Sequence, residues 1–375
     1  MSNWKVFNKS GKHRVLVTKM LPGEEWLDIL IGANYRIEVN LSNEITTKSE
    51  IVKKIGGNCK AIIGQLTENW DEALFQIFSS AGGVVYCNYA VGYNNVNVKA
   101  ASKYKIAIGN TPGVLAETTS EMTVALTMAC ARRIVEADSF MGKGSFKGWL
   151  PNLFLGKRLY GSTLGIIGAG RIGSAFALMM IKAFQMNLIY FSNRENPDIE
   201  NTINEYNNFL RKTNDKPVSV KRVMVIENLL READVISLHT PLNEATHHMI
   251  DKNAFSIMKN DAILINTSRG SIIDEKSLVE HCENNPLFMA GLDVFENEPL
   301  MNDGLVDLDN IVVAPHIASA TKWTREGMAK LSALNIKGVL ENYAFSKSED
   351  ISLFLSQKPP NSIPSIVNSE VLYFK

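Results

Sequence analysis

The chain has 375 residues, of which 45% are hydrophobic and 21% are charged. At roughly 150 residues per domain, this length predicts about two domains, and the composition excludes a mainly disordered chain. Basic and acidic residues balance at 39 each, so the formal net charge is zero. A neutral chain lacks the charge signature of a dedicated nucleic-acid or membrane-surface binder, and no apolar run is long enough for a membrane span.

The N-terminal part of the sequence alternates between two patterns. Short runs rich in β-branched residues occur at 13–19, 35–41, 60–66 and 82–89, and polar stretches with helical spacing separate them. This alternation predicts a parallel sheet with helices on both faces. Residues 118–137 are apolar with helical spacing and predict one long buried helix, followed by a Gly-, Pro- and aromatic-rich arm or linker.

A second series of the same kind begins at Ser162 with a strand, a glycine-rich turn and a helix. Further strands are predicted at 233–240, 262–268, 288–294 and 310–316. The polar residues 195–221 are interpreted as a surface insertion, and the tail after Ser346 is expected to be loosely ordered. Together the two series predict an α/β protein with two doubly wound parallel sheets.

The strongest single motif is the glycine-rich turn Gly168-Ala169-Gly170-Arg171-Ile172-Gly173, which follows a predicted strand and opens a predicted helix. Gly168 permits a tight turn, Gly170 lets a pyrophosphate approach the backbone, and Gly173 lets helix and strand pack closely. The helix N-terminus then presents N–H groups and partial positive charge to the phosphates. The motif predicts a dinucleotide-binding site.

The end of the next strand predicts which dinucleotide is bound. Enzymes that use NAD place a carboxylate there to bind the ribose hydroxyls. Here the strand ends in Ser192, Asn193 and Arg194, which could hydrogen-bond and neutralise a 2′-phosphate. We therefore expect NADP(H) to be the preferred cofactor, with NAD(H) also possible. The alternative is that Arg194 is only a solvated surface residue.

Three residues after strands of the second series form a candidate acid–base set: Arg269, Glu298 and His316. Ligands of open α/β sheets bind at the carboxyl ends of the strands. An arginine can bind the carboxylate or polarise the carbonyl of a 2-keto acid, and a histidine can protonate the alkoxide that forms. A neighbouring glutamate favours the protonated imidazole through its opposite charge. Each residue alone would more often be structural.

The full set of motifs resembles a known family. The segments GIIGAGRIGSA, VISLHTPLNEATHHMI, INTSRGSIIDEKSLVE, AGLDVFENEP and VVAPHIASAT resemble, in order and spacing, the D-isomer-specific 2-hydroxyacid dehydrogenases. Within that family, YAVGYNNVNVKAA, GWLPNLF and the insertion after MNLIYF are similar to plant-type hydroxypyruvate reductases. The resemblance implies NAD(P)H-dependent reduction of hydroxypyruvate to D-glycerate, and of glyoxylate to glycolate.

The resemblance also implies roles for individual residues. Arg269 would bind substrate, Glu298 would be the partner of the histidine, and His316 would donate the proton. Backbone N–H groups of Val91 and Gly92 would bind the substrate carboxylate. The other implied contacts are to the cofactor: Arg171 and Ile172 at the pyrophosphate, with Thr119, Thr240, Thr267, Ser268 and Asp293 on the ribose and nicotinamide side.

The family architecture implies two Rossmann-like domains with a cleft between them. The substrate-binding domain would comprise residues 1–118 and 318–375, and the dinucleotide-binding domain residues 119–317. Family members are usually homodimers, so a homodimer is expected. The chain departs from plant enzymes at Ser192, where NADH users carry Asp, and at its end, which is not Ser-Lys-Leu. We therefore expect a cytoplasmic protein, with a peroxisomal location as the alternative.

Other functions remain open on the sequence alone. A dinucleotide-sensing corepressor shares the fold and even the Arg, Glu and His set, and phosphoglycerate dehydrogenase is an alternative within the family. The preference between hydroxypyruvate and glyoxylate is also open. The pair His247-His248 could indicate a metal, but no further ligand lies near it in the sequence, so no metal site is predicted.

Overall fold

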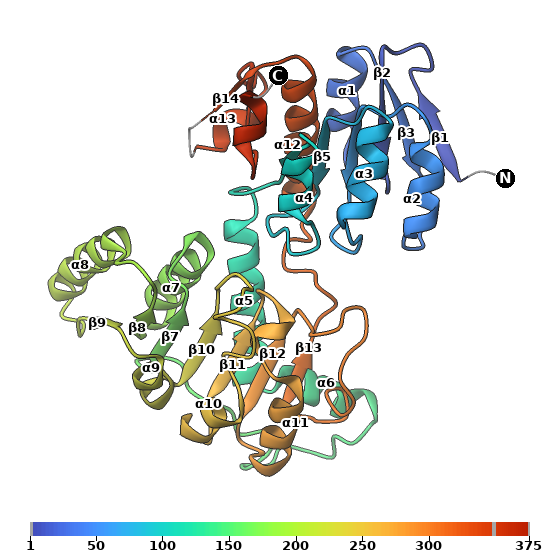
Figure 1. The fold of residues 1–375 in the computed structure, drawn as a ribbon. Helices are drawn as coiled ribbons and strands as arrows, with labels where there is room; N and C mark the ends of the chain where they lie inside the picture. The colour runs from blue at the N-terminus through green and yellow to red at the C-terminus, as the bar shows by residue number, and fades with distance from the viewer. Residues whose placement is uncertain (1–2, 347–349, 374–375) are drawn as a thin grey trace. The chain divides into compact units, whose positions relative to one another are not determined.

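The computed structural model describes residues 3–346 and 350–373. The chain divides into two compact units, which are described separately here (Figure 1). Unit 1 comprises Met1–Leu115 and Ala320–Lys375, and unit 2 comprises Ala116–Ser319. Within the described ranges, no helix is both long enough and apolar enough to cross a membrane.

Unit 1 is built on a sheet with the strand order β1-β3-β2-β4-β5-β6. The strands β2 to β6 pair in parallel, and β1 adds an antiparallel edge next to β3. The order reverses direction at β2, as in doubly wound folds. The strands are β1 (Trp4–Phe7), β2 (His13–Val17), β3 (Tyr35–Asn40), β4 (Ala61–Gly64), β5 (Val85–Asn88) and β6 (Ala107–Gly109).

Helices cover both faces of this sheet because each βα connection returns the chain over it. One face is filled by an aromatic cluster in which Trp70 contacts Phe75, Phe78 and Tyr86. The helices are α1 (Glu25–Gly32), α2 (Lys48–Ile55), α3 (Glu72–Ser80), α4 (Val98–Lys103) and the long α12 (Lys322–Leu340).

The expectation of a loosely ordered tail is wrong for residues 350–373. Asn368 is buried, its Oδ1 accepts a hydrogen bond from the N–H of Ile108 at 2.8 Å, and its Nδ2 donates to the carbonyl of Ile106 at 2.9 Å. These bonds fasten the tail to the edge strand β6, a tertiary contact that local composition does not reveal. The tail elements are β14 (Ala344–Phe345), α13 (Ser352–Leu355), β15 (Ser362–Ile363) and a 3₁₀ turn (Ser369–Tyr373).

Unit 2 is built on a sheet with the order β13-β12-β11-β10-β7-β8-β9. Each pairing in it is parallel, and the order reverses direction between β7 and β10. This is the classic dinucleotide-binding order with one further strand. The strands are β7 (Thr163–Ile167), β8 (Asn187–Phe191), β9 (Val220–Val223), β10 (Val235–Leu238), β11 (Ile263–Asn266), β12 (Met289–Leu292) and β13 (Ile311–Val313).

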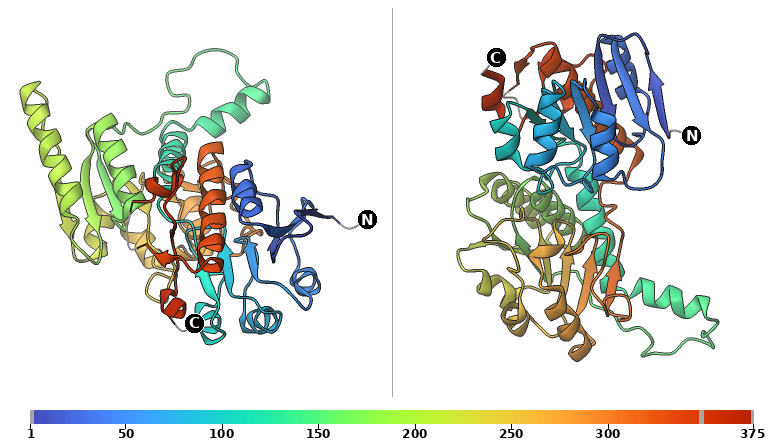
Figure 2. Two further views of the ribbon diagram at one scale, coloured as in Figure 1. Left: turned by 90° about the horizontal axis from the view of Figure 1, so that it is seen from above. Right: turned by 45° about the vertical axis from the view of Figure 1, so that its right-hand side comes forward.

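The helix predicted over 118–137 is broken into two. The first, α5 (Ala116–Ala131), packs on the sheet, and the second, α6 (Ile134–Gly142), begins after Arg133, whose backbone is left-handed with φ of 50°. The arm that follows α6 extends away from the rest of unit 2 (Figure 2). The remaining helices of the unit are α7 (Arg171–Phe184), α8 (Pro197–Lys212), α9 (Ile226–Glu232), α10 (Lys252–Ile257), a 3₁₀ turn (Gly270–Ile272) and α11 (Glu275–Asn284).

Residues 195–221 form helix α8 and lead into β9, so they are an integral part of the sheet layer rather than an excursion. Asn196 caps the helix by accepting a hydrogen bond from the N–H of Ile199, and Pro197 occupies the first turn. One face buries Ile199, Ile203 and Leu210 in the core shared with α7, and Figure 2 shows the two helices side by side. The polar majority of this segment is its solvent face.

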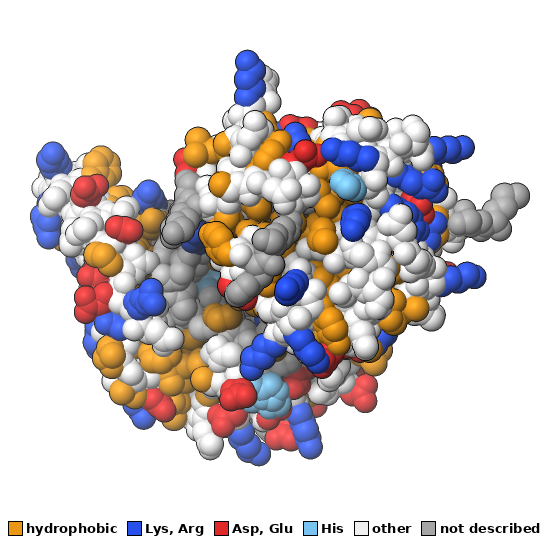
Figure 3. All heavy atoms as spheres, turned by 45° about the horizontal axis from the view of Figure 1, so that its top comes forward, with side chains coloured by type: hydrophobic (Ala, Val, Ile, Leu, Met, Phe, Trp, Pro, Cys, Tyr) orange, Lys and Arg blue, Asp and Glu red, His pale blue; other side chains and the backbone are white. Residues whose placement is uncertain are grey.

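Charges of both signs are interspersed over the face drawn in Figure 3. That distribution agrees with the balanced composition of the chain. A continuous face of one sign, as nucleic-acid binding needs, is not present in this view.

Candidate functional site

The glycine-rich turn joins β7 to α7 and uses each glycine for a different reason. Gly168 has a φ of 98°, and a Cβ there would lie 2.7 Å from the carbonyl carbon of His239. A Cβ on Gly173 would lie 2.2 Å from the carbonyl oxygen of Gly168, so helix and turn are in close contact. A Cβ on Gly170 would point into open space, with no atom within 4 Å. The turn is therefore closely packed at Gly168 and Gly173 and open to solvent at Gly170.

This open surface fits a dinucleotide. It lies at the carboxyl ends of β7 and β10, where the strand order reverses and where ligands of such sheets bind. Thr240, which follows β10, contacts the turn, and its buried Oγ1 has no hydrogen-bond partner among the described groups. A ligand hydroxyl or phosphate oxygen would satisfy that atom.

The N-terminus of α7 suits an anion. Gly170 caps the helix without a side-chain hydrogen bond, and the first turn contains no acidic residue. The N–H groups of the first turn have no intrahelical acceptors, and the helix dipole adds positive potential. Arg171 and Ile172 begin this turn, and the carbonyl of Ile172 accepts a hydrogen bond from Ser120 of α5 at 3.0 Å.

The strand β8 ends at a loop held by an arginine that the sequence interpretation missed. Arg222 of β9 donates from Nη2 to the carbonyls of Ser192 and Asn193, at 3.0 and 3.2 Å. Its Nη1 lies 3.3 Å from Glu195, and its buried Nε has no partner among the described groups. Arg194, by contrast, is exposed. Arg222 reaches this loop because the register of β8 with β9 pairs it with Tyr190. That register is known only once the two strands are paired in the sheet, so the sequence did not reveal this contact.

Arg269 is positioned by a buried asparagine, Asn266, at the end of β11. The Asn266 Nδ2 donates to the Arg269 carbonyl at 2.9 Å, and its Oδ1 accepts from the N–H of Ser268 at 3.0 Å and from its hydroxyl at 2.8 Å. The side chain thus shapes the turn that carries the arginine. Burial lowers the pKa of Arg269 and nearby Glu298 opposes this, but a guanidinium stays charged at neutral pH.

His316 and Glu298 are in direct contact. The His316 Nδ1 lies 2.8 Å from the Glu298 Oε2, and each side chain is about one-third exposed, at 30% and 33%. The Glu298 Oε1 also accepts from the N–H of Phe295 at 3.0 Å. Burial acts to raise the pKa of Glu298, but the hydrogen bond and charge of His316 outweigh it and hold that pKa below its usual value. The carboxylate therefore stays ionised and orients the imidazole.

Asp293 holds the backbone that carries His316. Its Oδ1 accepts from the N–H of Ile317 at 2.8 Å, and its Oδ2 accepts from the N–H of Ala318 at 2.7 Å. His316 itself has a left-handed φ of 53°, an unusual conformation for this residue type. Asp293 is fully buried and burial raises its pKa, although these two hydrogen bonds oppose the rise. This positioning role was not foreseen.

The other histidine beside the turn cannot serve as the acid. Burial lowers the pKa of His239 to about 3, so the ring is neutral at physiological pH. Its Nε2 lies 2.9 Å from the Ser237 hydroxyl. His239 is therefore a supporting residue rather than the proton donor.

The threonines predicted at the nicotinamide side come from two elements of unit 2. The hydroxyl of Thr123 of α5 donates to the carbonyl of Thr119 at 2.8 Å and can then accept from the hydroxyl of Thr267 at 3.0 Å. Thr119 and Thr267 are both buried. The structure thus brings Thr119, Thr267 and Ser268 to one region of unit 2, with Thr123 as a link that the sequence did not single out.

Val91 and Gly92 lie in unit 1, in the loop after β5. Asn110 donates to the Val91 carbonyl and Asn88 donates to the Gly92 carbonyl, each at 2.9 Å. Among the described residues, nothing accepts a hydrogen bond from the N–H of either Val91 or Gly92. These two hydrogen bonds hold the loop in place, and the N–H groups of Val91 and Gly92 are then available to bind a carboxylate.

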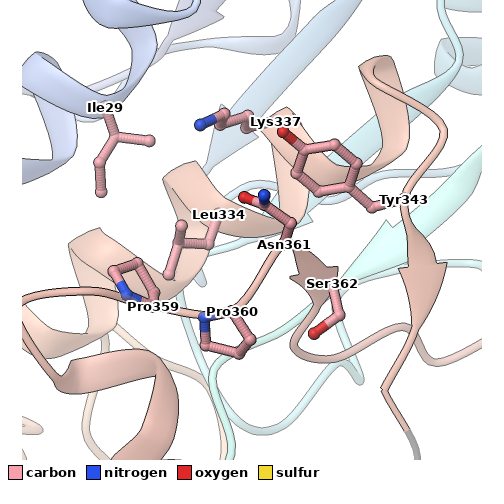
Figure 4. Close-up of a pocket in the computed structure, with 8 residues that line it drawn as sticks. All are labelled: Ile29, Leu334, Lys337, Tyr343, Pro359, Pro360, Asn361 and Ser362. Atoms are coloured by element: carbon pink, nitrogen blue, oxygen red, sulfur yellow. The ribbon is translucent and has the colours of Figure 1, made fainter.

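A separate small cavity of about 260 Å³ lies within unit 1 (Figure 4). Leu334 and Lys337 of α12 face the tail residues Asn361 and Ser362 across it. None of the predicted site residues lines this cavity.

Comparisons with known proteins agree with this geometry. The family model for the D-isomer specific 2-hydroxyacid dehydrogenase NAD binding domain matches residues 124–318. The peroxisomal glycerate dehydrogenase HPR of Arabidopsis thaliana is 51% identical over 371 residues, 98% of this chain and 96% of that protein. Glyoxylate reductase of Thermococcus litoralis is 39% identical, covering 96% and 98%. A crystal structure from Thermus thermophilus, 35% identical, has a TM-score of 0.78 and covers 94% and 99%.

Proposed function

Because this chain belongs to the D-isomer-specific 2-hydroxyacid dehydrogenase family, a family with a nicotinamide-dinucleotide-binding domain, we propose that it reduces hydroxypyruvate to D-glycerate and glyoxylate to glycolate. Relatives named glycerate dehydrogenase and glyoxylate reductase support this substrate class. The observation that carries the proposal is the His316–Glu298 pair, held in the same unit as Arg269 and the glycine-rich turn.

In this proposal His316 donates the proton that the substrate oxygen acquires on reduction. Its Nδ1 is occupied by Glu298, so its Nε2 is the atom that faces substrate. The Glu298 carboxylate fixes the orientation of the ring. Asp293 positions the imidazole through the backbone of Ile317 and Ala318.

Arg269 and unit 1 would share the binding of substrate. The planar guanidinium of Arg269 can bind the substrate carboxylate and carbonyl together, and burial strengthens both bonds. The N–H groups of Val91 and Gly92 would bind the carboxylate as well. Unit 1 is then the substrate-binding domain and unit 2 the dinucleotide-binding domain.

The dinucleotide, when bound, supplies the hydride. Gly168, Gly170 and Gly173 would accommodate the pyrophosphate against the N–H groups of Arg171 and Ile172. Thr240, with its unpartnered Oγ1, would bind on the ribose side. Thr119, Thr267 and Ser268 would line the nicotinamide side, and Asp293 would border it.

NADP(H) would be the preferred cofactor. Ser192 and Asn193 can hydrogen-bond a 2′-phosphate, Arg194 can neutralise it, and Arg222 beneath the loop adds positive charge. A charge-assisted bond contributes about 1.5–3 kcal/mol, or roughly one to two decades in affinity. The double substitution Ser192→Asp with Arg194→Ala should reverse the preference in kcat/KM. Wild-type protein that uses NADH ten times better than NADPH would contradict this proposal.

A homodimer is also part of the proposal. Apolar side chains on α6 and the following arm are exposed: Ile134, Val135, Met141, Phe146, Trp149, Leu150 and Leu155. A patch of this kind on a single chain is typical of a protein–protein interface. Light scattering of the purified protein would measure the oligomeric state.

The deciding experiment is turnover of hydroxypyruvate with NADPH by the purified protein. We expect ordinary enzymatic rates, with glyoxylate as a second substrate. A dinucleotide-sensing corepressor of the same fold would bind the dinucleotide without such turnover. Binding of NADPH without reduction of either keto acid would therefore overturn the proposed activity and favour that alternative.

A further inference from the structure

A second histidine–glutamate pair lies in unit 2, joined by an adjacent histidine. The Nε2 of His248 hydrogen-bonds the Oε1 of Glu296. The ring of His247 stacks on that of His248, with centroids 4.0 Å apart and planes inclined by 28°. One donor atom from each side chain lies within 4.8 Å of the other two. We refer to these three residues as the His247–His248–Glu296 cluster.

The backbone fixes all three side chains at their roots. The N–H of His247 donates to the carbonyl of Asn243 at 2.9 Å, and that of His248 donates to Ser271 at 2.8 Å. His248 also has a left-handed φ of 48°, and its ring contacts Glu296. The N–H of Glu296 donates to a Glu275 oxygen at 2.7 Å. Little ordering would be needed to bring these donors onto one ion, which favours binding.

Two further carboxyl groups lie close to the cluster. Glu275 is 2% exposed, its Oε2 has no hydrogen-bond partner among the described groups, and burial and the nearby Glu296 raise its pKa. Asp274 interacts favourably with His248. Three carboxyl groups thus lie close to two imidazoles, an arrangement that a divalent cation would stabilise.

We propose that the His247–His248–Glu296 cluster binds a zinc ion. Two imidazole nitrogens and one carboxylate oxygen are a preferred ligand set for Zn²⁺, whereas Mg²⁺ and Ca²⁺ require mostly oxygen ligands. Water completes the coordination on the side of His247, which is exposed. The proposal does not depend on the reaction proposed above.

Zinc at this cluster would also act on the turn that carries Glu298. Glu296 lies two positions before Glu298, and the N–H of Phe295 holds the Glu298 carboxylate. Coordination of Glu296 would restrict this turn, so bound zinc should raise the temperature of unfolding.

The test is calorimetric titration of tag-free, chelator-treated protein with Zn²⁺ alone. We expect one ion per chain, and at least roughly tenfold weaker binding in each of His247→Ala and Glu296→Gln, since each variant removes one ligand. Glu296→Gln keeps the shape of the side chain and His247 is exposed, so both variants should fold, as thermal melts would verify. Lys252→Ala, an exposed neighbour in the sequence, should bind as wild type does.

His316→Ala is the decisive control, because His316 and Glu298 are also an imidazole and a carboxylate in contact. We expect this variant to keep the zinc site. The proposal is overturned if wild-type protein binds no zinc, if His247→Ala and Glu296→Gln leave binding unchanged, or if His316→Ala alone abolishes it. Equal binding of Mg²⁺ at the same site would also contradict it.

Discussion

The first βα connections of the two units occupy equivalent places in their sheets and differ in chemistry. In unit 1, Gly23 precedes α1, and a Cβ there would lie 2.8 Å from Glu326. The N-cap of α1 is Glu24, and its first turn contains Glu25 and Asp28. In unit 2, Gly170 opens onto free space and no acid lies in the first turn of α7.

The same architecture therefore gives one helix terminus whose first turn suits an anion and one whose acidic residues disfavour it. Acidic residues at the start of α1 already interact favourably with its dipole, and Glu25 pairs with Lys330 of α12. At α7 that favourable interaction is left for a ligand. The doubly wound sheet supplies the position, and the residues of the connection decide whether a phosphate can bind.

The largest expected effect is the loss of kcat when the proposed acid of unit 2 is removed, compared with a histidine substitution in unit 1. His316→Ala should lower kcat by roughly 10² to 10⁴-fold, because the proton donor is lost, while affinity for the dinucleotide hardly changes. His13→Gln in unit 1 is the matched control and should retain activity. Steady-state kinetics and cofactor titration measure both effects. Near-normal kcat in a folded His316→Ala variant would remove this residue from the proposed role.

Arg269→Lys should give the next largest effect. Lysine keeps the charge but cannot form two parallel bonds to the substrate, so kcat/KM should fall by about 10- to 100-fold. Part of the loss should appear in KM and part in kcat. Arg36→Lys in unit 1 serves as a control for the same exchange. Wild-type kinetics in Arg269→Lys would exclude a bidentate contact.

Gly173→Ala tests the tight packing of the α7 turn. The new Cβ would lie 2.2 Å from the Gly168 carbonyl oxygen, so the free energy of unfolding should fall by about 1–3 kcal/mol. Gly32→Ala in α1 has open space around it and should be neutral or slightly stabilising. Denaturant titration compares the two. Equal stability of both variants would show that the turn has room that the structure does not indicate.

The smallest expected effect is a shift in pH dependence. The pKa of Glu298 lies below its usual value, so its carboxylate keeps its charge, and its contact with His316, until pH falls to that lowered pKa. Glu298→Gln removes the group that titrates there. The loss of keto-acid reduction on the acid side of the pH–rate profile should therefore change in this variant. An acid side identical to that of the wild type would argue against a role for the pair.

Local patterns predicted most strands because β-branched runs and turns are encoded within a few residues. They failed where distant contacts decide. The short strand β6 and the tail at Asn368 stabilise each other through bonds across more than 250 positions, such as that from Ile108 to Asn368. The polar, Asn- and Lys-rich composition of residues 195–221 predicted an insertion, yet the three buried apolar side chains of α8 pack it on α7.

The sequence by itself predicted the glycine-rich turn and the order of the βα series, because residue type and spacing carry that information. Arg269, Glu298 and His316 stood out from it only together with the resemblance to a known family. Only the tertiary structure decided how these residues are held. Asn266 shapes the arginine turn, Asp293 holds the histidine loop, and Arg222 supports the loop after β8. It also brought Glu296 to His248, 48 positions away. Such contacts depend on which strands become neighbours in the sheet, and that is set by packing of the whole unit rather than by any local segment.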